Sequence, residues 1–304
     1  MKLITVLNNI SNKEKVVTIG NFDGVHKGHQ MLINTTLEIS KANNYESAIL
    51  TFDNLPEEVF EKSSFKRLYD NKLKARYIEE LGIDTLLQID FNELKNISHT
   101  SFCEDILMNK LNVKHVVVGD NFRFGKDRSG NVETLKKYRD SGMTLHCPKL
   151  AMIDGENISS SRIRKLLIKG EFKKAELCLG RKYLIKGVVT HGEQLGRKLG
   201  FPTANIKLEH DYPLSGVFIT ATEISGNIYP SLTSIGSKPT YNGTENILEV
   251  YIFDFSQDIY EEIIEVTFFE KIRDQIKFHD QDELIKQMNE DYKYAIINIK
   301  KYGL

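Results

Sequence analysis

The spacing of the apolar runs changes near residue 180, and this change divides the chain into two parts with different expected folds. Before that point, short apolar runs alternate with amphipathic stretches. After it, β-rich segments follow one another with short turns between them. The first pattern is typical of βαβ units with a parallel sheet, and the second of an antiparallel barrel or sandwich. We therefore expect two domains, residues 1–180 and 181–304, which the length of 304 residues allows.

The first part is expected to be an α/β domain whose parallel sheet is covered by helices on both faces. Its strands are predicted at four apolar runs, 16–19, 48–52, 85–89 and 116–118. Its helices are predicted up to about Ala42, over 72–81 and from about Ser101. Ligands of such sheets bind beyond the carboxyl ends of the strands, so the loops there are the first place to look for a site.

The second part begins near Leu179–Lys182, after two short helices predicted over 161–168 and 172–179. Its strands are separated by turn residues such as Ser225-Gly226-Asn227. A helix predicted over 281–300 closes the chain. Its apolar face is expected to consist of Leu284, Met288, Tyr292, Ile296 and Ile297.

Composition excludes several classes of protein. The formal charge of −1 argues against a broad nucleic-acid surface or a membrane-binding face. The three cysteines are far apart and form no C-x-x-C pair, which indicates a reducing compartment. The chain contains no apolar run of about 18 residues and no leader-like N-terminus, so we expect a cytoplasmic protein, monomeric or weakly oligomeric, without membrane or nucleic-acid partners.

The segment TIGNFDGVHKGHQ, residues 18–30, directly follows the first predicted strand. Its histidines, His26 and His29, have three possible chemical roles: metal ligands, acid and base, or phosphate ligands. They could also be plain surface residues of a turn. Metal binding is disfavoured because no third His or Cys is close in the sequence and Lys27 would repel a cation.

Phosphate binding accounts for more of this segment. Glycines at Gly20, Gly24 and Gly28 let the backbone approach a ligand. A helix predicted to begin at His29 would point free N–H groups at phosphate, and the imidazoles would stabilise charge on a transferring phosphoryl group. The G-x-x-x-x-G-K-[ST] phosphate loop is absent from the chain.

A second segment, ISSSRIR at residues 158–164, has a similar character. One serine at a helix start is usually only a cap. Several serines followed by Arg162 and Arg164 instead indicate a second phosphate-binding helix start, because Arg grips phosphate oxygens with two N–H groups.

Together these segments resemble the nucleotidyltransferase superfamily, whose signatures are H-x-G-H and I-S-S-T-x-x-R. With VVVGDNFRFG at residues 116–125, the first part resembles the FMN adenylyltransferase half of bacterial bifunctional riboflavin kinase/FAD synthetases. The resemblance implies a Rossmann-like nucleotidyltransferase fold, catalytic roles for His26 and His29, and a flavin- or adenine-binding role for Asn121. It further implies that ATP and its phosphates are bound by Gly20, Phe22, Asp23, Gly24, Ser160, Ser161, Arg162 and Arg164.

The second part contains LGRKLGFPTANI at residues 195–206. Gly200 and Pro202 favour a bend, whereas Thr203 and Asn205 offer the hard oxygen ligands that Mg²⁺ prefers. Taken alone, this could be a polar hairpin turn. The full string GFPTAN resembles the riboflavin kinase motif and implies that Gly200, Pro202, Thr203 and Asn205 bind Mg-ATP.

Glu249 interrupts the apolar strand ILEVYIF, and on the local pattern alone it would be a solvent-facing strand residue. The family position that it matches is the general base that deprotonates the terminal ribityl hydroxyl of riboflavin. The resemblance therefore implies a riboflavin kinase-like barrel with Glu249 as its base. The overall function implied is synthesis of FMN and then FAD, with ATP, riboflavin and FMN as substrates and Mg²⁺ as cofactor.

The chain departs from the family pattern at several positions. Leu55 stands where the family's T-F-x-P-H-P string has histidine, which puts the rate of adenylyl transfer in doubt. Ser161 replaces threonine, Tyr251 a histidine, Glu261 a glycine and Gln275 an acidic residue. Alternatives therefore stay open: one working half, a non-catalytic flavin-binding regulator, or a nucleic-acid reader of the H-x-G-H type, which the neutral charge disfavours.

Overall fold

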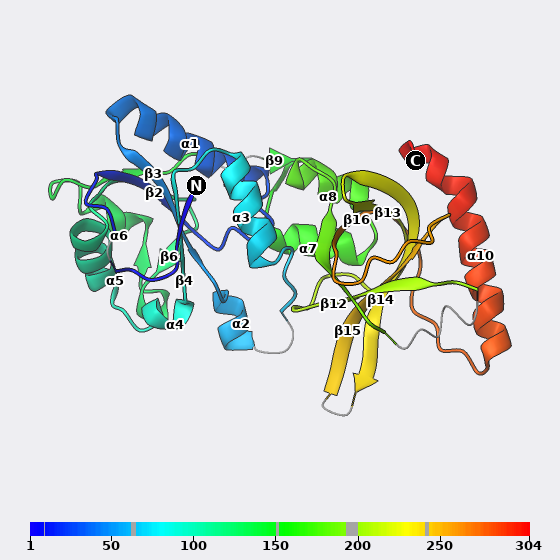
Figure 1. Ribbon diagram of the computed structural model, residues 1–304. Coiled ribbons are helices and arrows are strands. Elements are labelled where there is room, and N and C mark those ends of the chain that lie inside the picture. The colour runs from blue at the N-terminus through cyan, green and yellow to red at the C-terminus, as the bar shows by residue number, and fades with distance from the viewer. Residues whose placement is uncertain (9, 62–64, 150–151, 193–199, 241–242) are drawn as a thin grey trace. The chain divides into compact units, whose positions relative to one another are not determined.

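The computed structural model describes residues 1–8, 10–61, 65–149, 152–192, 200–240 and 243–304, with side chains left undescribed at 61 and 237–246. The chain forms two compact units (Figure 1). The first comprises Met1–Phe65 and Tyr69–Ser160, and the second Lys66–Leu68 and Ser161–Leu304. The helical pair expected before the barrel, α7 (Ser160–Ile168) and α8 (Phe172–Leu179), lies almost entirely in the second unit. The division into residues 1–180 and 181–304 stays a prediction.

The first unit contains a six-stranded, fully parallel sheet in the order β1-β4-β3-β2-β5-β8 (Figure 1). The four predicted strands are present, and two edge strands were not predicted because each is only three residues long. The strands of the sheet are β1 (Lys2–Ile4), β2 (Lys15–Ile19), β3 (Glu46–Phe52), β4 (Thr85–Ile89), β5 (Val113–Val117) and β8 (Thr144–His146).

Helices and short pairings complete this unit. Helices α5 and η1 form one continuous segment whose later turns are the wider π type. The helices are α1 (Lys27–Asn43), α2 (Pro56–Glu61), α3 (Asn71–Glu80), α4 (Phe91–Leu94), α5 (His99–Ser101), η1 (Phe102–Lys110), η2 (Lys126–Arg128) and α6 (Val132–Lys136). The short strand pairs are β6 (Arg123–Phe124) with β7 (Gly130–Asn131) and β9 (Met152–Ile153) with β10 (Glu156–Asn157).

Both faces of the sheet are buried, as predicted. All five residues of β2 are buried, and alternate ones pack into different clusters. Val16 packs with Leu32 of α1 on one face, whereas Val17 and Ile19 belong to the large cluster on the other. Strand β2 lies in the middle of the sheet with β3 on one side and β5 on the other, so strand order reverses there, and a ligand crevice is expected at the carboxyl ends of β2 and β5.

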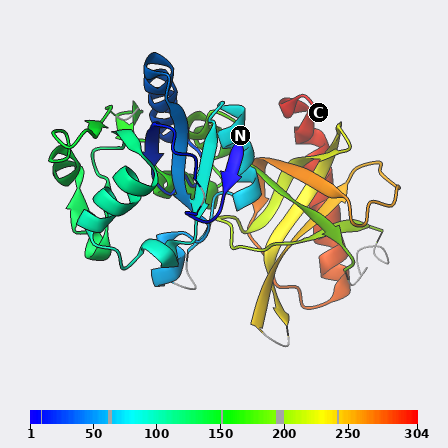
Figure 2. The ribbon, with the colours of Figure 1, turned by 60° about the vertical axis from the view of Figure 1, so that its left-hand side comes forward.

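The second unit is a closed six-stranded antiparallel barrel, in the order β11-β12-β15-β14-β13-β16, which decides between the barrel and the sandwich (Figure 2). Ser225 and Gly226 both have positive φ in the β13–β14 hairpin, as a type I′ turn requires. The strands are β11 (Leu184–Thr190), β12 (Thr203–Lys207), β13 (Gly216–Ile224), β14 (Asn227–Thr240), β15 (Gly243–Ile252) and β16 (Ile263–Arg273).

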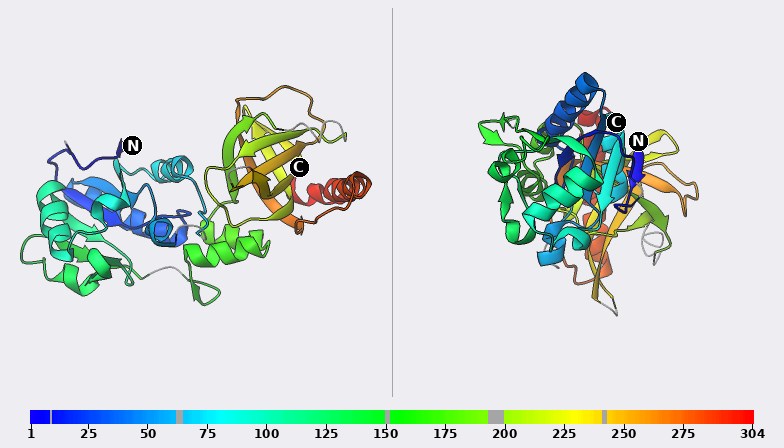
Figure 3. Two further views of the ribbon diagram at one scale, coloured as in Figure 1. Left: turned by 90° about the horizontal axis from the view of Figure 1, so that it is seen from below. Right: turned by 90° about the vertical axis from the view of Figure 1, so that its left-hand side faces the viewer.

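Helix α10 (Gln281–Ile299) packs beside the barrel and is followed by the short turn η3 (Lys300–Tyr302) (Figure 3). The predicted range is confirmed, but part of the predicted apolar face is wrong. Ile296 and Ile297 are 40% and 72% exposed, whereas Ala295 and Ile299 are buried in the core cluster. The helix is rotated because Asp291, a polar residue, is buried against Arg273, and a hydrophobic pattern does not register such a pair.

Candidate active sites

The loop after β2 has a tightly turned backbone. Phe22, Gly24 and Val25 have φ values of 50°, 84° and 39°, in the left-handed region that non-glycine residues rarely adopt. Phe22 is fully buried, and its ring lies 5.0 Å from that of His29. The side chain of Phe22 therefore supports the loop from inside.

Helix α1 begins at Lys27, two residues before the predicted start at His29. His26 is the N-cap: its Nδ1 accepts a hydrogen bond from the backbone N–H of His29 at 3.3 Å. This bond leaves Nε2 of His26 as the nitrogen that can carry the donated proton. The free helix N–H groups are thus those of Lys27 and Gly28, which donate to no residue that the structure describes.

The two histidines lie against each other. Their rings are stacked with centroids 3.6 Å apart and planes 15° apart. A Cβ at Gly28 would lie 3.2 Å from Cε1 and Nδ1 of His26. Glycine at this position therefore lets the His26 ring pack closely against the start of the helix. Parallel rings do not aim their nitrogen lone pairs at one point, and this arrangement suits hydrogen bonding to a phosphate better than chelation of one cation.

The second predicted phosphate segment contacts the first at its start. The hydroxyl of Ser160 donates to the backbone carbonyl of Asp23 at 2.8 Å, and Asp23 itself is only 3% exposed. Ser161 is exposed and Arg162 half-buried on the first turn of α7. Arg164 donates from Nε to the backbone carbonyl of Lys66 at 2.6 Å, so part of its guanidinium has a structural role that the sequence did not show.

Asn121 lies exposed on the turn that follows β5. Strand β5 is hydrogen-bonded in parallel to β2, so this turn and the His26 loop leave the same edge of the sheet at neighbouring strands. The sheet thus places Asn121 at the edge where a ligand of the loop is expected.

Leu55, at the position of the missing histidine, is 2% exposed. Its backbone N–H donates to the carboxylate of Glu58 at 2.9 Å, at the start of α2. The side chain faces the protein interior and offers no polar group to a nucleotide.

The kinase candidates share one face of the barrel. Asn205 on β12 is directly opposite Glu249 on β15, and Thr203 is opposite Tyr251. The strand neighbours of Glu249, Leu248 and Val250, are fully buried and point into the barrel, so the three candidates and Tyr251 point outward. All four are half-buried. Sequence reasoning found Glu249, Thr203 and Asn205 separately, and the register brings them together.

Gly192, which lies outside the GFPTAN motif, leaves the space that the Asn205 side chain occupies. A Cβ at Gly192 would lie 2.5 Å from Nδ2 and 2.6 Å from Cγ of Asn205, closer than real contacts allow. The Asn205 amide also donates weakly to the carbonyl of Thr203, at 3.4 Å. Residues 193–199, which include Gly196 of the motif, lie outside the described residues; Gly200, with φ of 84°, and the exposed Pro202 follow them.

An aromatic group borders this face. The ring of Phe201, from the GFPTAN string, lies 5.2 Å from that of Tyr251, and Tyr292 of α10 lies 5.8 Å from Tyr251. Burial raises the pKa of the Tyr251 phenol, and the neighbouring Tyr292 adds to the shift. Tyr251, a departure from the family pattern, is thus a neutral packed phenol.

Gln275, another departure, stabilises β14. Its amide donates to the hydroxyl of Ser234 at 3.0 Å and to the carbonyl of Ile235 at 2.9 Å. Ser234 is the cross-strand partner of Glu249. Because Gln275 carries a neutral amide, it makes these bonds without adding a second negative charge near Glu249, to which it is linked through Ser234. Local sequence did not reveal this link, because the three residues lie in separate segments.

Comparison with known proteins agrees with both halves. The chain matches a family model described as FAD synthetase over residues 8–162 and one described as riboflavin kinase over residues 179–298. Curated proteins named bifunctional riboflavin kinase/FMN adenylyltransferase are similar along the whole chain. That of Buchnera aphidicola (subsp. Schizaphis graminum) is 39% identical over 99% of both chains, and that of Haemophilus influenzae 37% over 97% of this chain and 98% of the relative.

The chain belongs to this bifunctional family. A solved structure from Streptococcus pneumoniae, titled a macrolide-efflux protein, has a TM-score of 0.81 and 31% identity, over 97% of this chain and 99% of the other. The predicted family and fold class are thereby confirmed, and the chain is a transferase with a kinase half and an adenylyltransferase half. Within the part that the structure describes, no helix combines the length and apolar character that crossing a membrane requires.

Proposed function

We propose that the chain makes FMN and FAD by two successive transfers from ATP. Riboflavin and ATP give FMN and ADP in the barrel unit, and FMN and a second ATP give FAD and pyrophosphate in the parallel-sheet unit. The observation that carries the proposal furthest is the direct cross-strand pairing of Asn205 with Glu249, beside Thr203, on an outward face of the barrel. A base and two oxygen ligands at that spacing are what phosphoryl transfer to a hydroxyl needs.

In the kinase step, Glu249 accepts the proton of the terminal ribityl hydroxyl as that oxygen attacks the γ-phosphorus. Thr203 and Asn205 would hold Mg²⁺ through their side-chain oxygens, a fit that rests on this hard donor set. The ion, when bound, neutralises charge on the phosphates. Gly192 leaves room for the Asn205 amide, which donates weakly to the Thr203 carbonyl.

In the adenylyl step, the FMN phosphate attacks the α-phosphorus of ATP in line and pyrophosphate leaves. His26 donates from Nε2, and the backbone N–H groups of Lys27 and Gly28 lie at the positive end of α1. His29 acts beside His26 on the charge that builds up in the transition state. No covalent intermediate is required, because positioning and electrostatics supply the acceleration.

The remaining assignments rest on the resemblance. Ser160, Ser161, Arg162 and Arg164 would bind the triphosphate, and Asn121 the flavin or adenine. Part of Arg164 is committed to the Lys66 carbonyl, so its terminal N–H groups would serve this purpose. We further propose that the protein works in the cytoplasm as a monomer or weak oligomer, without nucleic-acid or membrane partners.

Two single variants test the assignment of one reaction to each site. His29→Ala should abolish FAD formation from supplied FMN and leave riboflavin phosphorylation intact. Glu249→Ala should abolish phosphorylation and leave FAD formation from FMN intact. Both products are resolved by chromatography after incubation with ATP and magnesium.

Loss of both activities in either variant would contradict the two-site assignment. Unchanged FMN output from Glu249→Ala would exclude this residue as the base. If the unmodified protein made only FMN, the buried Leu55 would be the first residue to restore to histidine, and flavin binding without ATP turnover would favour the regulator alternative.

A further inference from the structure

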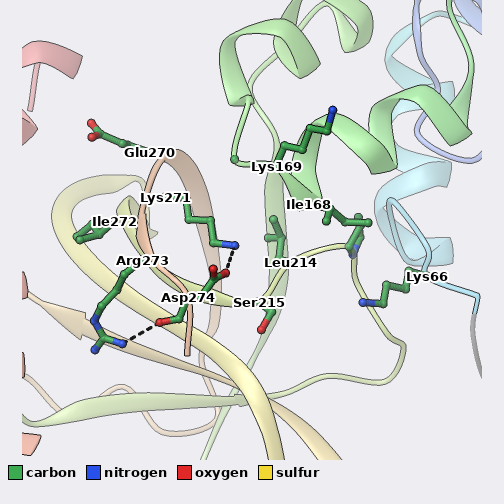
Figure 4. A pocket seen from close by; sticks show the side chains of 12 residues that line it. Lys66, Ile168, Lys169, Leu214, Ser215, Glu270, Lys271, Ile272, Arg273 and Asp274 are labelled. Carbon is green, nitrogen blue, oxygen red and sulfur yellow. Dashed lines mark hydrogen bonds and ion pairs between the residues drawn. The ribbon is translucent and has the colours of Figure 1, made fainter. Parts of the chain in front are cut away.

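A cavity of about 620 Å³ lies in the second unit, lined entirely by residues of that unit. Its walls come from the short segment at Lys66, the turn after α7, the loop before β13 and the end of β16 (Figure 4). The kinase face is on β12 and β15, and β14 lies between β15 and β13 in the barrel. None of Glu249, Thr203 and Asn205 lines this cavity.

The lining of this cavity is basic, although the chain as a whole has a net charge of −1. Four cationic side chains and two carboxylates line it. Arg273 is held by Asp291 of α10 at 2.6 Å, and Glu270 accepts hydrogen bonds from two tyrosines. Lys66 and Lys169, by contrast, form no ion pair with any residue in the described ranges.

The side chains are placed to meet a ligand between them. Figure 4 shows Lys66 and Lys271 extending toward each other from opposite walls. In this view Ser215 lies between their ends, and Lys169 points away from the cavity. Lys271 is shared with Asp274, whose carboxylate lies 2.5 Å from its Nζ and is 86% exposed. An anion bound between Lys66 and Lys271 would replace the exposed Asp274 carboxylate as the ion-pair partner of Lys271.

One wall of the cavity is fixed by close packing. Gly170 has φ of 75°, and a Cβ there would lie 2.8 Å from Cβ of Lys271. The turn after α7 thus lies directly against β16, and only glycine permits this approach. Leu214 and Ile168 add apolar surface next to the lysines. A fixed apolar wall with a few convergent polar groups is typical of small-molecule sites.

We propose that this cavity is a second binding site, specific for a small molecule that carries a phosphate monoester or polyphosphate group. Lys66 and Lys271 bind the phosphate oxygens, and Ser215 donates its hydroxyl. The apolar wall accepts the rest of the ligand. The volume suits a nucleotide or flavin nucleotide and excludes a polymer.

Lysine footprinting of the full chain tests the site directly. The protein is reductively methylated with and without saturating FMN, ADP, inorganic pyrophosphate or riboflavin, and each lysine is quantified by mass spectrometry. FMN, ADP or pyrophosphate should slow methylation of Lys66 and Lys271 several-fold. Riboflavin, which lacks phosphate, should not, and the most effective compound identifies the source of the phosphate. Lys165 and Lys173, exposed on α7 and α8, serve as internal controls.

A matched pair of variants completes the test. Lys66→Gln should raise the ligand concentration that half-protects Lys271 by roughly tenfold or more, because a charged hydrogen-bond donor is lost. Lys165→Gln carries the same charge change outside the cavity and should have no effect. FMN and FAD output, measured in parallel, reports the two transfer reactions independently. No protection, equal protection by riboflavin, or protection unaffected by Lys66→Gln would overturn the proposal.

Discussion

Gly192→Ala is expected to disable the kinase site through one added methyl group. The new Cβ would lie 2.5 Å from Nδ2 and 2.6 Å from Cγ of Asn205, whereas ordinary contact begins at 3.4 Å. The Asn205 amide therefore has to move by roughly 0.9 Å, the difference between 3.4 and 2.5 Å. Gly192 has no unusual φ, so the backbone accepts alanine and the steric effect is isolated.

The size of the effect follows from the precision that transfer demands. A displacement of about 1 Å in a positioning group costs about a hundredfold in rate. We therefore expect kcat/KM for riboflavin phosphorylation to fall by about a hundredfold, or about 2.7 kcal/mol of transition-state stabilisation. FAD formation from supplied FMN should stay within twofold, because it takes place in the other unit.

A double-mutant cycle makes this prediction decisive. Asn205→Ala alone should lower kinase activity at least as much, and adding Gly192→Ala to it should change nothing further, because the clashing amide is gone. Kinase activity of Gly192→Ala within threefold of the unmodified protein would refute the reasoning. Additive losses in the double variant would show that Gly192 acts through another group.

Three further changes probe the packing and charge of the fold. Asp291→Ala leaves the half-buried Arg273 guanidinium without its buried carboxylate and should lower the free energy of unfolding by about 3 kcal/mol in urea titration; a loss under 1 kcal/mol would show that water replaces the pair. Glu261→Gly removes a side chain from a φ of 66° and should stabilise by about 1 kcal/mol, seen as a higher Tm. His115 and His146 are hydrogen-bonded at 2.9 Å, and burial lowers the pKa of both below 6.5. The unfolded chain then binds more protons, so stability is complete above about pH 6.5 and falls below it, and His115→Asn should flatten this fall in urea midpoints from pH 7.5 to 5.

Much of the first unit was predictable because its strands are buried on both faces. Runs such as Val16–Ile19 carry a strong local signal, and all of β2 is buried. The three-residue edge strands β1 and β8 have no comparable signal. The sequence predicts the start of α1 two residues late, because histidine is not a usual N-cap and its Nδ1 acceptor role shows only in three dimensions.

The sequence identifies the kinase residues one by one, but it does not show that they lie next to one another. Glu249 and Asn205 are 44 positions apart, and only the β12–β15 register places them opposite each other. Gly192 had no motif of its own, since its importance lies in the space that it leaves for Asn205. The basic cavity was equally hidden, because Lys66 and Lys271 come from distant segments. The roles of the individual site residues stay predictions.

The short stretch Lys66–Leu68 has a consequence for how this chain can be divided. It is built into the second unit although 92 residues of the first unit follow it, from Tyr69 to Ser160. There the Arg67 N–H donates to the carbonyl of Asp211 at 2.8 Å, and the Lys66 carbonyl accepts from Arg164. The kinase unit is therefore formed by two separate stretches of the sequence. A fragment that starts at residue 179 would encode every residue of the barrel and still lack a strip of its packed surface.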